Sequence, residues 1–143
     1  GERALVEIGP KFYLQRISWL YGPNGGNFVN TMLDLGATYD NLTVVNDQHG
    51  GPTFTKDVAE ATKTLIEEQY PFGIYHTPNE GTATWYEFAN KIFQISHTKV
   101  DVKPCGSEEY QRPANRPKWS VLVNTKGPRM RPWIKALEEY LLG

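Results

Sequence analysis

The sequence has few of the residues that build a metal site or a disulfide. It contains one cysteine, Cys105, and three histidines at unrelated spacings, His49, His76 and His97. A single cysteine cannot close an internal disulfide, and a structural zinc site needs about four cysteine or histidine ligands at short spacings. We therefore expect neither an internal disulfide nor a bound metal.

Excess charge of one sign and long apolar runs are also missing. The chain has 15 basic and 16 acidic residues and a formal net charge of −1, whereas nucleic acids and membrane surfaces attract clustered basic residues. No apolar run approaches the roughly 20 residues of a membrane-spanning helix, and no secretory signal is recognisable. We expect no nucleic-acid or membrane partner, and a cytoplasmic location.

Short strands and amphipathic helices alternate along the 143 residues, which predicts an α/β fold with a small sheet. Residues 104–129 are rich in proline, glycine and polar side chains, so we expect them to wrap the surface after Pro104 ends the last strand. Strands are expected at 12–17, 42–45, 73–76 and 100–102, and helices at 1–8, 28–35, 56–69, 85–93 and from 132 onward.

Several helix ends carry sequence signals. Asn27 and Thr55 are expected N-caps, Thr84–Glu87 has the pattern of a capping box, and Pro132 is expected at the first position of the last helix. The first helix has a Gly9-Pro10 stop but no N-cap before it, so we expect the sequence to begin inside an element. The inward stripe expected for the helix at 56–69 is Val58, Thr62, Leu65 and Ile66.

Neither a glycine-rich phosphate-binding turn nor a catalytic Tyr-Lys pair occurs at the required spacing. The loop Gly22–Gly26 lies between a predicted strand and helix, but its glycines do not follow the G-x-G-x-x-G spacing, and Pro23 removes a backbone N–H. None of the eight tyrosines is followed four residues later by the lysine that would lower its pKa in a short-chain reductase, and Lys91 lies five after Tyr86. We expect an ordinary turn at residues 22–26 and no catalytic residue.

Other polar residues have simpler interpretations. Four acidic side chains are expected on a solvated helix face: Asp57, Glu60, Glu67 and Glu68. His49 is interpreted as a loop residue. His76 ends a predicted strand near Asn79, where it either lines a pocket or is satisfied by local hydrogen bonds.

Two loops favour a binding role. Ser18–Gly22 places Trp19 directly after a predicted parallel strand, and ligands of α/β proteins sit at the carboxyl ends of such strands. Val45–Thr55 is dense in amide, hydroxyl and glycine groups, which allow close backbone approach and directed hydrogen bonds to a polar ligand.

The same residues, in order along nearly the whole chain, closely resemble the dTDP-4-dehydrorhamnose reductase family of extended short-chain dehydrogenases/reductases. The matching segments are Arg16–Gly22, Asn27-Phe28, Val45–Gln48, Gly51–Thr53, Asp57–Ala59, Gly73–His76, Trp85–Ala89 and Arg116-Pro117. The resemblance implies the C-terminal, substrate-binding portion of such an enzyme over residues 1–143, with about residues 1–20 as the tail of the Rossmann part that binds the cofactor.

The resemblance also implies a ligand and its contacts. A full-length member reduces the 4-keto group of a dTDP-linked 6-deoxy-hexulose with NAD(P)H, giving dTDP-L-rhamnose. The expected partner is a dTDP-sugar, and no cofactor is expected to bind this chain, which is expected to lack reductase activity alone. Trp19 would pack against the sugar, and Arg116 would clamp the diphosphate through charge-assisted hydrogen bonds. The other implied pocket residues are Asn27, Phe28, Gln48, Pro52 and Thr53.

Two alternatives remain open at this point. One is a reductase-like regulatory or binding subunit without catalytic activity. The other is a different nucleotide-sugar reductase or epimerase, which would differ in the nucleotide-sugar that it binds.

Overall fold

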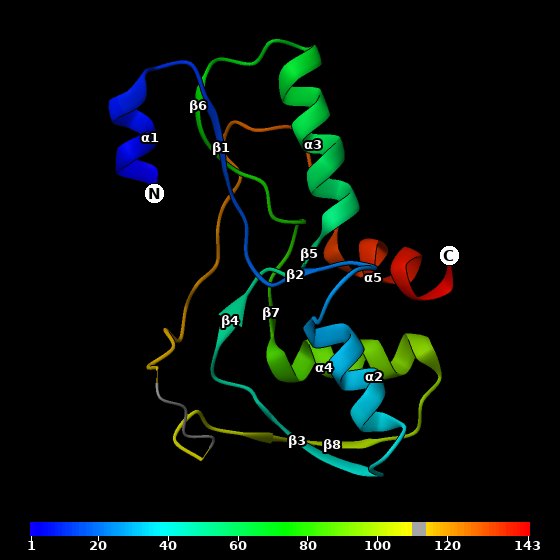
Figure 1. The fold of residues 1–143 in the computed structure, drawn as a ribbon. Coiled ribbons are helices and arrows are strands. Elements are labelled where there is room, and N and C mark those ends of the chain that lie inside the picture. The colour runs from blue at the N-terminus through cyan, green and yellow to red at the C-terminus, as the bar shows by residue number, and fades with distance from the viewer. Residues whose placement is uncertain (110–113) are drawn as a thin grey trace.

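The computed structural model describes residues 1–109 and 114–143, and confirms an α/β fold with small parallel sheets (Figure 1). Residues 110–113 of the predicted surface segment lie outside the described residues. The elements form an upper and a lower group in Figure 1, joined by short strand pairs and the C-terminal helix.

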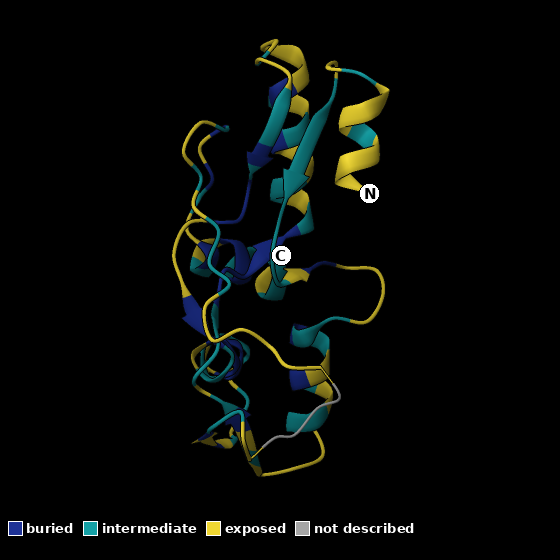
Figure 2. Cartoon of the chain, turned by 90° about the vertical axis from the view of Figure 1, so that its left-hand side faces the viewer, coloured by how far each residue is buried: buried dark blue, intermediate teal, exposed yellow. Residues whose placement is uncertain are grey.

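The upper group is built on two parallel strands, β1 (Tyr13–Arg16) and β6 (Gly73–His76), in the register Tyr13↔Gly73 to Arg16↔His76. Helix α3 (Thr55–Glu67) packs beside them, and Gln15 donates a hydrogen bond to Thr62 of this helix. Helix α1 (Glu2–Ile8) lies on the other side of the strands and has no buried residue (Figures 1 and 2).

The lower group is built on the parallel strands β3 (Asn41–Val45) and β8 (Asp101–Cys105). Helices α2 (Phe28–Gly36) and α4 (Trp85–Ser96) pack together above them in Figure 1. Val45 pairs with Cys105, so both strands end at the same edge of the sheet. The loops that follow them therefore start side by side.

Short strands connect the two groups. Strand β2 (Leu20–Tyr21) pairs in parallel with β5 (Thr53–Phe54), and β4 (His49–Gly50) pairs antiparallel with β7 (Ala83–Thr84). Helix α5 (Trp133–Leu142) packs against α4 and β5. The predicted loop at residues 46–54 thus contains two strands of two residues each, too short for a period-two pattern to reveal.

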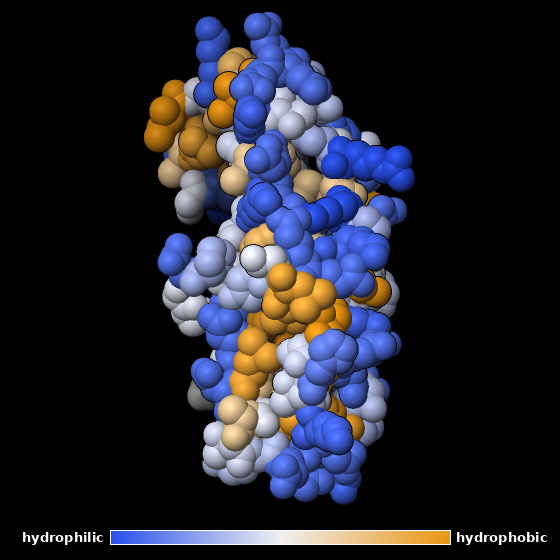
Figure 3. Space-filling view, turned by 90° about the vertical axis from the view of Figure 1, so that its right-hand side faces the viewer, coloured by the Kyte–Doolittle hydropathy of each residue, from blue (hydrophilic) through white to orange (hydrophobic). Residues whose placement is uncertain are grey.

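Aromatic side chains form the centre of the core. Phe88 is fully buried, and its ring lies 5.4 Å from that of Phe28, 5.7 Å from Tyr21 and 5.6 Å from Trp133. Because these rings come from four different elements, their packing holds α2, α4, α5 and β2 together. Apolar surface also gathers across the middle of the face that carries α5, whose Leu142 is 69% exposed (Figure 3).

Two predicted caps are confirmed. The Asn27 side chain accepts a hydrogen bond from the backbone N–H of Asn30, and Thr84 and Glu87 form a reciprocal capping box at the start of α4. The predicted inward face of α4 is also confirmed, with Phe88, Ala89, Ile92 and Phe93 buried and Trp85 half-buried.

Three predictions for α3 are wrong. The helix begins at Thr55 itself, and Phe54 occupies the N-cap position without a side-chain cap, because β5 runs directly into the helix. Ile66 is 58% exposed, and Ala61 takes its place in the buried stripe. Asp57 is only 13% exposed, because Arg131 from the segment before α5 binds it at 2.8 Å. Because Arg131 is 74 residues from Asp57, the local sequence pattern around Asp57 gives no sign of this contact.

Two predictions that involve proline are also wrong. Strand β8 continues through Pro104. Asp101 donates its N–H to Asp40 on the β3 side, and N–H groups alternate along a strand, so the donor that Pro104 lacks would point away from β3. Pro132 is at the N-cap of α5 rather than its first position, and its carbonyl accepts from Lys135 and Ala136.

Among the described residues, no helix is both long and apolar enough to cross a membrane.

Glu139 on α5 should make the fold sensitive to acid. Its carboxylate accepts from Lys56 and Arg131, each at 2.5 Å, and these two cations lower its pKa. A carboxyl group whose pKa is lower in the folded state stabilises the fold at pH values above the ordinary pKa of a carboxyl group. This stabilisation is lost as the pH falls through the lowered pKa. We expect Glu139→Gln to lower the melting temperature at pH 7, with the difference from wild type shrinking below about pH 4.

Melting curves between pH 7 and pH 3 check this expectation. Glu138→Gln is the matched control, because Glu138 forms only an exposed pair with Lys135, and such pairs contribute little. A difference between Glu139→Gln and wild type that stays constant down to pH 3 would contradict the assigned role.

Candidate functional site

Trp19 lies immediately before β2 in a backbone conformation that few non-glycine residues adopt, with φ of +46°. Its indole stacks on that of Trp85, with ring centroids 3.6 Å apart and planes 12° apart. The Trp85 ring in turn lies 4.6 Å from Phe28. A non-glycine residue keeps a positive φ only when its surroundings fix it. The stack on Trp85 and the pairing of β2 with β5 therefore define the position of the Trp19 indole.

The loop that carries β4 packs directly against Trp19. A Cβ atom built on Gly50 would lie 2.3 Å from the indole Cε2, so only glycine fits there without displacement. Ser18 donates a hydrogen bond to the carbonyl of Gly51, and the backbone N–H of Thr53 donates to the carbonyl of Trp19. The two loops predicted to bind ligand, Ser18–Gly22 and Val45–Thr55, therefore lie in direct contact.

Asn27 is used as a structural cap. Its Oδ1 accepts from Asn30 N–H and its Nδ2 donates to the carbonyl of Gly22, each at 3.0 Å. The side-chain amide therefore holds the 22–27 loop onto α2. The first backbone N–H groups of a helix have no partner within the helix and favour negative charge, so a contact from this position to an anion would come from the backbone near Phe28.

Gln48 lies just beyond the carboxyl end of β3, in a small polar network with the loop after β8. Its Nε2 donates to the hydroxyl of Ser107 at 2.8 Å, and that hydroxyl donates to Asp47 at 2.6 Å. The two hydrogen bonds from Ser107, together with Lys118 at 3.6 Å, lower the pKa of Asp47. The carboxylate therefore stays charged, and it holds the two loops together.

Pro52 and Thr53 lie inside the protein. Both side chains are fully buried, and the Thr53 hydroxyl donates to the carbonyl of Gly51. They support the Val45–Thr55 loop from inside.

Arg116 is exposed. Two residues after it, the carbonyl of Lys118 accepts a hydrogen bond from the N–H of His49 in β4. The segment that contains Arg116 therefore lies beside β4, which begins directly after Gln48.

Four contributors to this region were not predicted. Trp85 was assigned to the helix face alone, His49 was interpreted as a plain loop residue, and Ser107 and Trp119 were given no role. Trp119 had one usable signal, a large aromatic residue within a polar, proline-rich segment. The Trp19–Trp85 stack joins residues 66 apart and the Gln48–Ser107 hydrogen bond joins residues 59 apart, so local spacing cannot reveal them.

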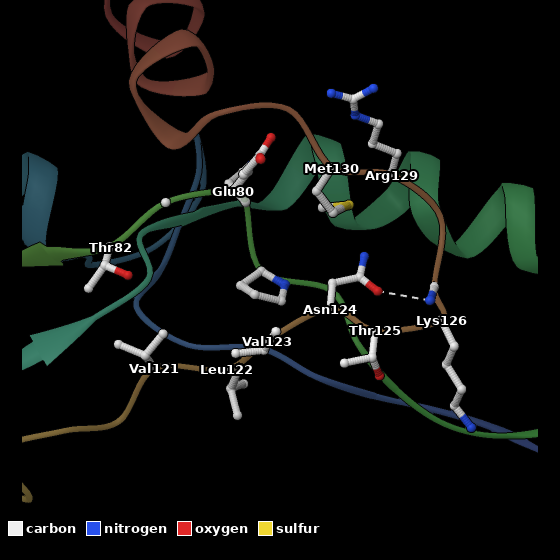
Figure 4. Close-up of a pocket in the computed structure, with 14 residues that line it drawn as sticks. Glu80, Thr82, Val121, Leu122, Val123, Asn124, Thr125, Lys126, Arg129 and Met130 are labelled. Carbon is white, nitrogen blue, oxygen red and sulfur yellow. Dashed lines mark hydrogen bonds between the residues drawn. The ribbon is translucent and has the colours of Figure 1, made fainter.

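A separate hollow of about 520 Å³ lies between residues 78–82 and residues 121–130 (Figure 4). Thr82 and Val121 are toward one end of it in Figure 4, and Lys126 is toward the other. Asn79 lines it, whereas His76, for which one interpretation predicted a place in a pocket, does not. His76 instead lies in hydrogen-bond contact with the Val123 carbonyl and Arg16. Pro78 and Gly81, which line the hollow, also approach Gly51.

The fold and this surface define an α/β domain with loops gathered at the carboxyl ends of parallel strands, where such domains hold their ligands. Comparison with protein families gives the same class. The family model described as the RmlD substrate binding domain matches residues 1–142. The chain belongs to this family.

Curated relatives agree with the assignment. The chain is 46% identical over 130 residues to the spore coat polysaccharide biosynthesis protein SpsK of Bacillus subtilis, covering 88% of this chain and 45% of the relative. It is 39% identical to a dTDP-4-dehydrorhamnose reductase of Streptomyces griseus, covering 97% of this chain and 49% of the relative. The chain spans about half the length of the curated relatives it matches.

Solved structures show the same fold. A dTDP-4-dehydrorhamnose reductase from Clostridium acetobutylicum is 43% identical with a TM-score of 0.92, covering 98% of this chain and 51% of that one. One from Bacillus anthracis, in complex with NADP, is 37% identical with a TM-score of 0.93, covering 99% and 52%. A UDP-glucose 4-epimerase from Thermus thermophilus, at 18% identity and a TM-score of 0.69, shares the fold alone.

Proposed function

We propose that this chain forms the nucleotide-sugar-binding part of a dTDP-4-dehydrorhamnose reductase. The observation that carries the proposal is the contact between the two predicted binding loops, in which the Trp19 indole, stacked on Trp85, lies against Gly50. An aromatic ring fixed in this way beside polar loops suits a sugar, which offers an apolar C–H face and a rim of hydroxyls. The names of the curated relatives support the dTDP-linked sugar as the ligand.

In this proposal each predicted residue has a part. Trp19 packs on the sugar, Phe28 and the start of α2 face the diphosphate, and Arg116 pairs with it as an exposed cation on the segment beside β4. Gln48 donates from the loop after β3, while Pro52 and Thr53 support that loop from inside. Asn27 acts through the cap that places Phe28.

The reduction itself is proposed for the parent protein. There, NAD(P)H would supply hydride to C4 of the sugar and a tyrosine would protonate the oxygen. The residues of this chain do not fit a cofactor-binding turn: residues 22–26 lack the G-x-G-x-x-G spacing, and Pro23 offers no backbone N–H to a phosphate. No hydride step is assigned to them. We also propose that β1 belongs to the sheet of the cofactor-binding part.

Calorimetric titration with dTDP-L-rhamnose tests the proposal. We expect the chain to bind this ligand, and Trp19→Ala and Arg116→Ala each to weaken binding about tenfold, by loss of ring packing and of a charge-assisted contact to the diphosphate. Arg3→Ala, on the exposed helix α1, should leave affinity unchanged. Unchanged affinity in both site variants would refute the placement of the site.

A further inference from the structure

The loops after β3 and β8 are joined by a network of three side chains, those of Gln48, Ser107 and Asp47. The Nε2 of Gln48 donates to the Ser107 hydroxyl at 2.8 Å, and that hydroxyl donates to Oδ1 of Asp47 at 2.6 Å. The backbone N–H of Ser107 donates to the same carboxylate oxygen at 3.1 Å. Ser107 is therefore bonded at once to Asp47 and to the side chain that is expected to meet the ligand.

The charge on Asp47 fixes the direction of the hydrogen bonds in this network. The hydrogen bonds from Ser107 and the nearby Lys118 lower the pKa of Asp47, so its carboxylate is ionised at neutral pH and can only accept. A serine hydroxyl has a single proton, and this proton goes to Asp47, so the Ser107 oxygen has to accept from Gln48. An amide donates only from its nitrogen. Nε2 of Gln48 therefore faces Ser107, and Oε1 is left for another partner.

The cation beside Asp47 comes from a segment whose backbone is held at the site. The Nζ of Lys118 lies 3.6 Å from the Asp47 carboxylate, and the Lys118 carbonyl accepts from the N–H of His49 at 2.8 Å. The next residue, Trp119, forms a parallel bridge with His49, and the centroids of their rings are 5.1 Å apart. The backbone of Lys118 is thus kept within reach of Asp47.

The Oε1 atom of Gln48 is the end of the network that a ligand can use. Within residues 1–109 and 114–143 no group donates a hydrogen bond to it, and the Gln48 side chain is only half-buried. Gly50, two residues further on, lies against the Trp19 indole. An acceptor whose orientation is already fixed loses little conformational entropy when a ligand donates to it.

We propose that Ser107 is a positioning residue for Gln48: it holds the amide by Nε2, so that Oε1 accepts a hydrogen bond from a hydroxyl group of the bound sugar. The proposal rests on the proposed function, because it takes the sugar to lie at Trp19. A keto oxygen has no proton to donate, so the group that meets Oε1 is a hydroxyl and not the 4-keto group. Ser107 itself touches no ligand and acts through Gln48.

A double-mutant cycle measured by calorimetric titration separates an effect through Gln48 from a general loosening of the loop. One neutral hydrogen bond changes affinity by about three- to tenfold. We expect Ser107→Ala and Gln48→Ala each to weaken dTDP-L-rhamnose binding by that factor, and Ser107→Ala to add nothing in the Gln48→Ala chain. Ser107→Thr should keep most of the affinity, because threonine retains the hydroxyl. Binding of dTDP, which lacks the sugar, should be the same in all these variants.

Ser96→Ala is the matched control, because Ser96 at the end of α4 is also half-buried and shares a hydrogen bond with another hydroxyl, that of Thr98. Unchanged dTDP-L-rhamnose affinity in Ser107→Ala, or an equal loss with and without Gln48, would overturn the positioning role. An equal loss for dTDP would place the donor outside the sugar and also overturn it. These outcomes leave the proposed function standing, whereas no binding of dTDP-L-rhamnose by the wild-type chain would refute that function and this inference with it.

Discussion

Replacing Gly50 with alanine should disrupt the candidate site and destabilise the fold. The new Cβ would lie 2.3 Å from Cε2 and 2.6 Å from Cζ2 of the Trp19 indole. The ring cannot swing away freely, because Trp85 stacks on its face and the adjoining backbone N–H of Thr53 is bonded to the Trp19 carbonyl. We expect a loss of about 1–3 kcal/mol in the free energy of unfolding, as for other overpacked sites.

Gly51→Ala provides the control in the next residue. Its Cβ would meet Pro78 and Ser18 at 3.5 Å, which is ordinary van der Waals contact. Denaturant titration should therefore separate the two variants, and calorimetry should show weaker dTDP-sugar binding for Gly50→Ala alone. Equal effects of the two alanines on stability and binding would show that the Trp19 contact does not position the site.

Replacing Asn79 with alanine should have the largest effect on stability of any polar substitution discussed. Its Oδ1 accepts from the N–H of Phe54 at 2.8 Å, and its Nδ2 donates to Asp57 and to the Arg131 carbonyl at 2.6 and 3.1 Å. All three bonds are lost in the variant. The Phe54 N–H would stay buried without its partner, and Asp57 would lose a donor. We expect a loss of about 2–4 kcal/mol.

The Asn79 bonds also reach the candidate site. Phe54 follows Thr53, whose backbone is bonded to Trp19, so a loosened β5 should weaken dTDP-sugar binding as well. Asn90→Ala is the matched control, because the Asn90 amide makes one bond within α4 and alanine is the better helix former. Denaturant titration compares the two variants. Comparable destabilisation by both would contradict the conclusion that the three hydrogen bonds of Asn79 stabilise the fold.

The elements with strong local patterns were predictable. The capping box at Thr84 and the apolar spacing of Phe88 and Ile92 placed α4 correctly, because helix capping and one-sided burial act within a few residues. The parallel strands β1 and β6 were also placed to within about two residues. Their pairing with each other joins residues 60 apart, and the sequence carried no sign of that register.

The sequence predicted which loops form the candidate site. It did not predict the contacts between residues that are far apart in the chain. Trp19 and the Gln48 loop were singled out by composition and resemblance, and the structure brings them together through Gly50. The burial of Asp57 was missed, because it depends on Arg131 arriving from the C-terminal segment. The support of Trp119 by His49 was missed for the same reason, since it depends on pairing across 70 residues.

The most direct test of the central claim is a calorimetric titration of the unmodified 143-residue chain with dTDP-L-rhamnose, with UDP-glucose as the comparison ligand. We expect saturable binding of one dTDP-L-rhamnose per chain and weaker binding of UDP-glucose. Absence of dTDP-L-rhamnose binding by a chain whose melting curve shows it to be folded would contradict it.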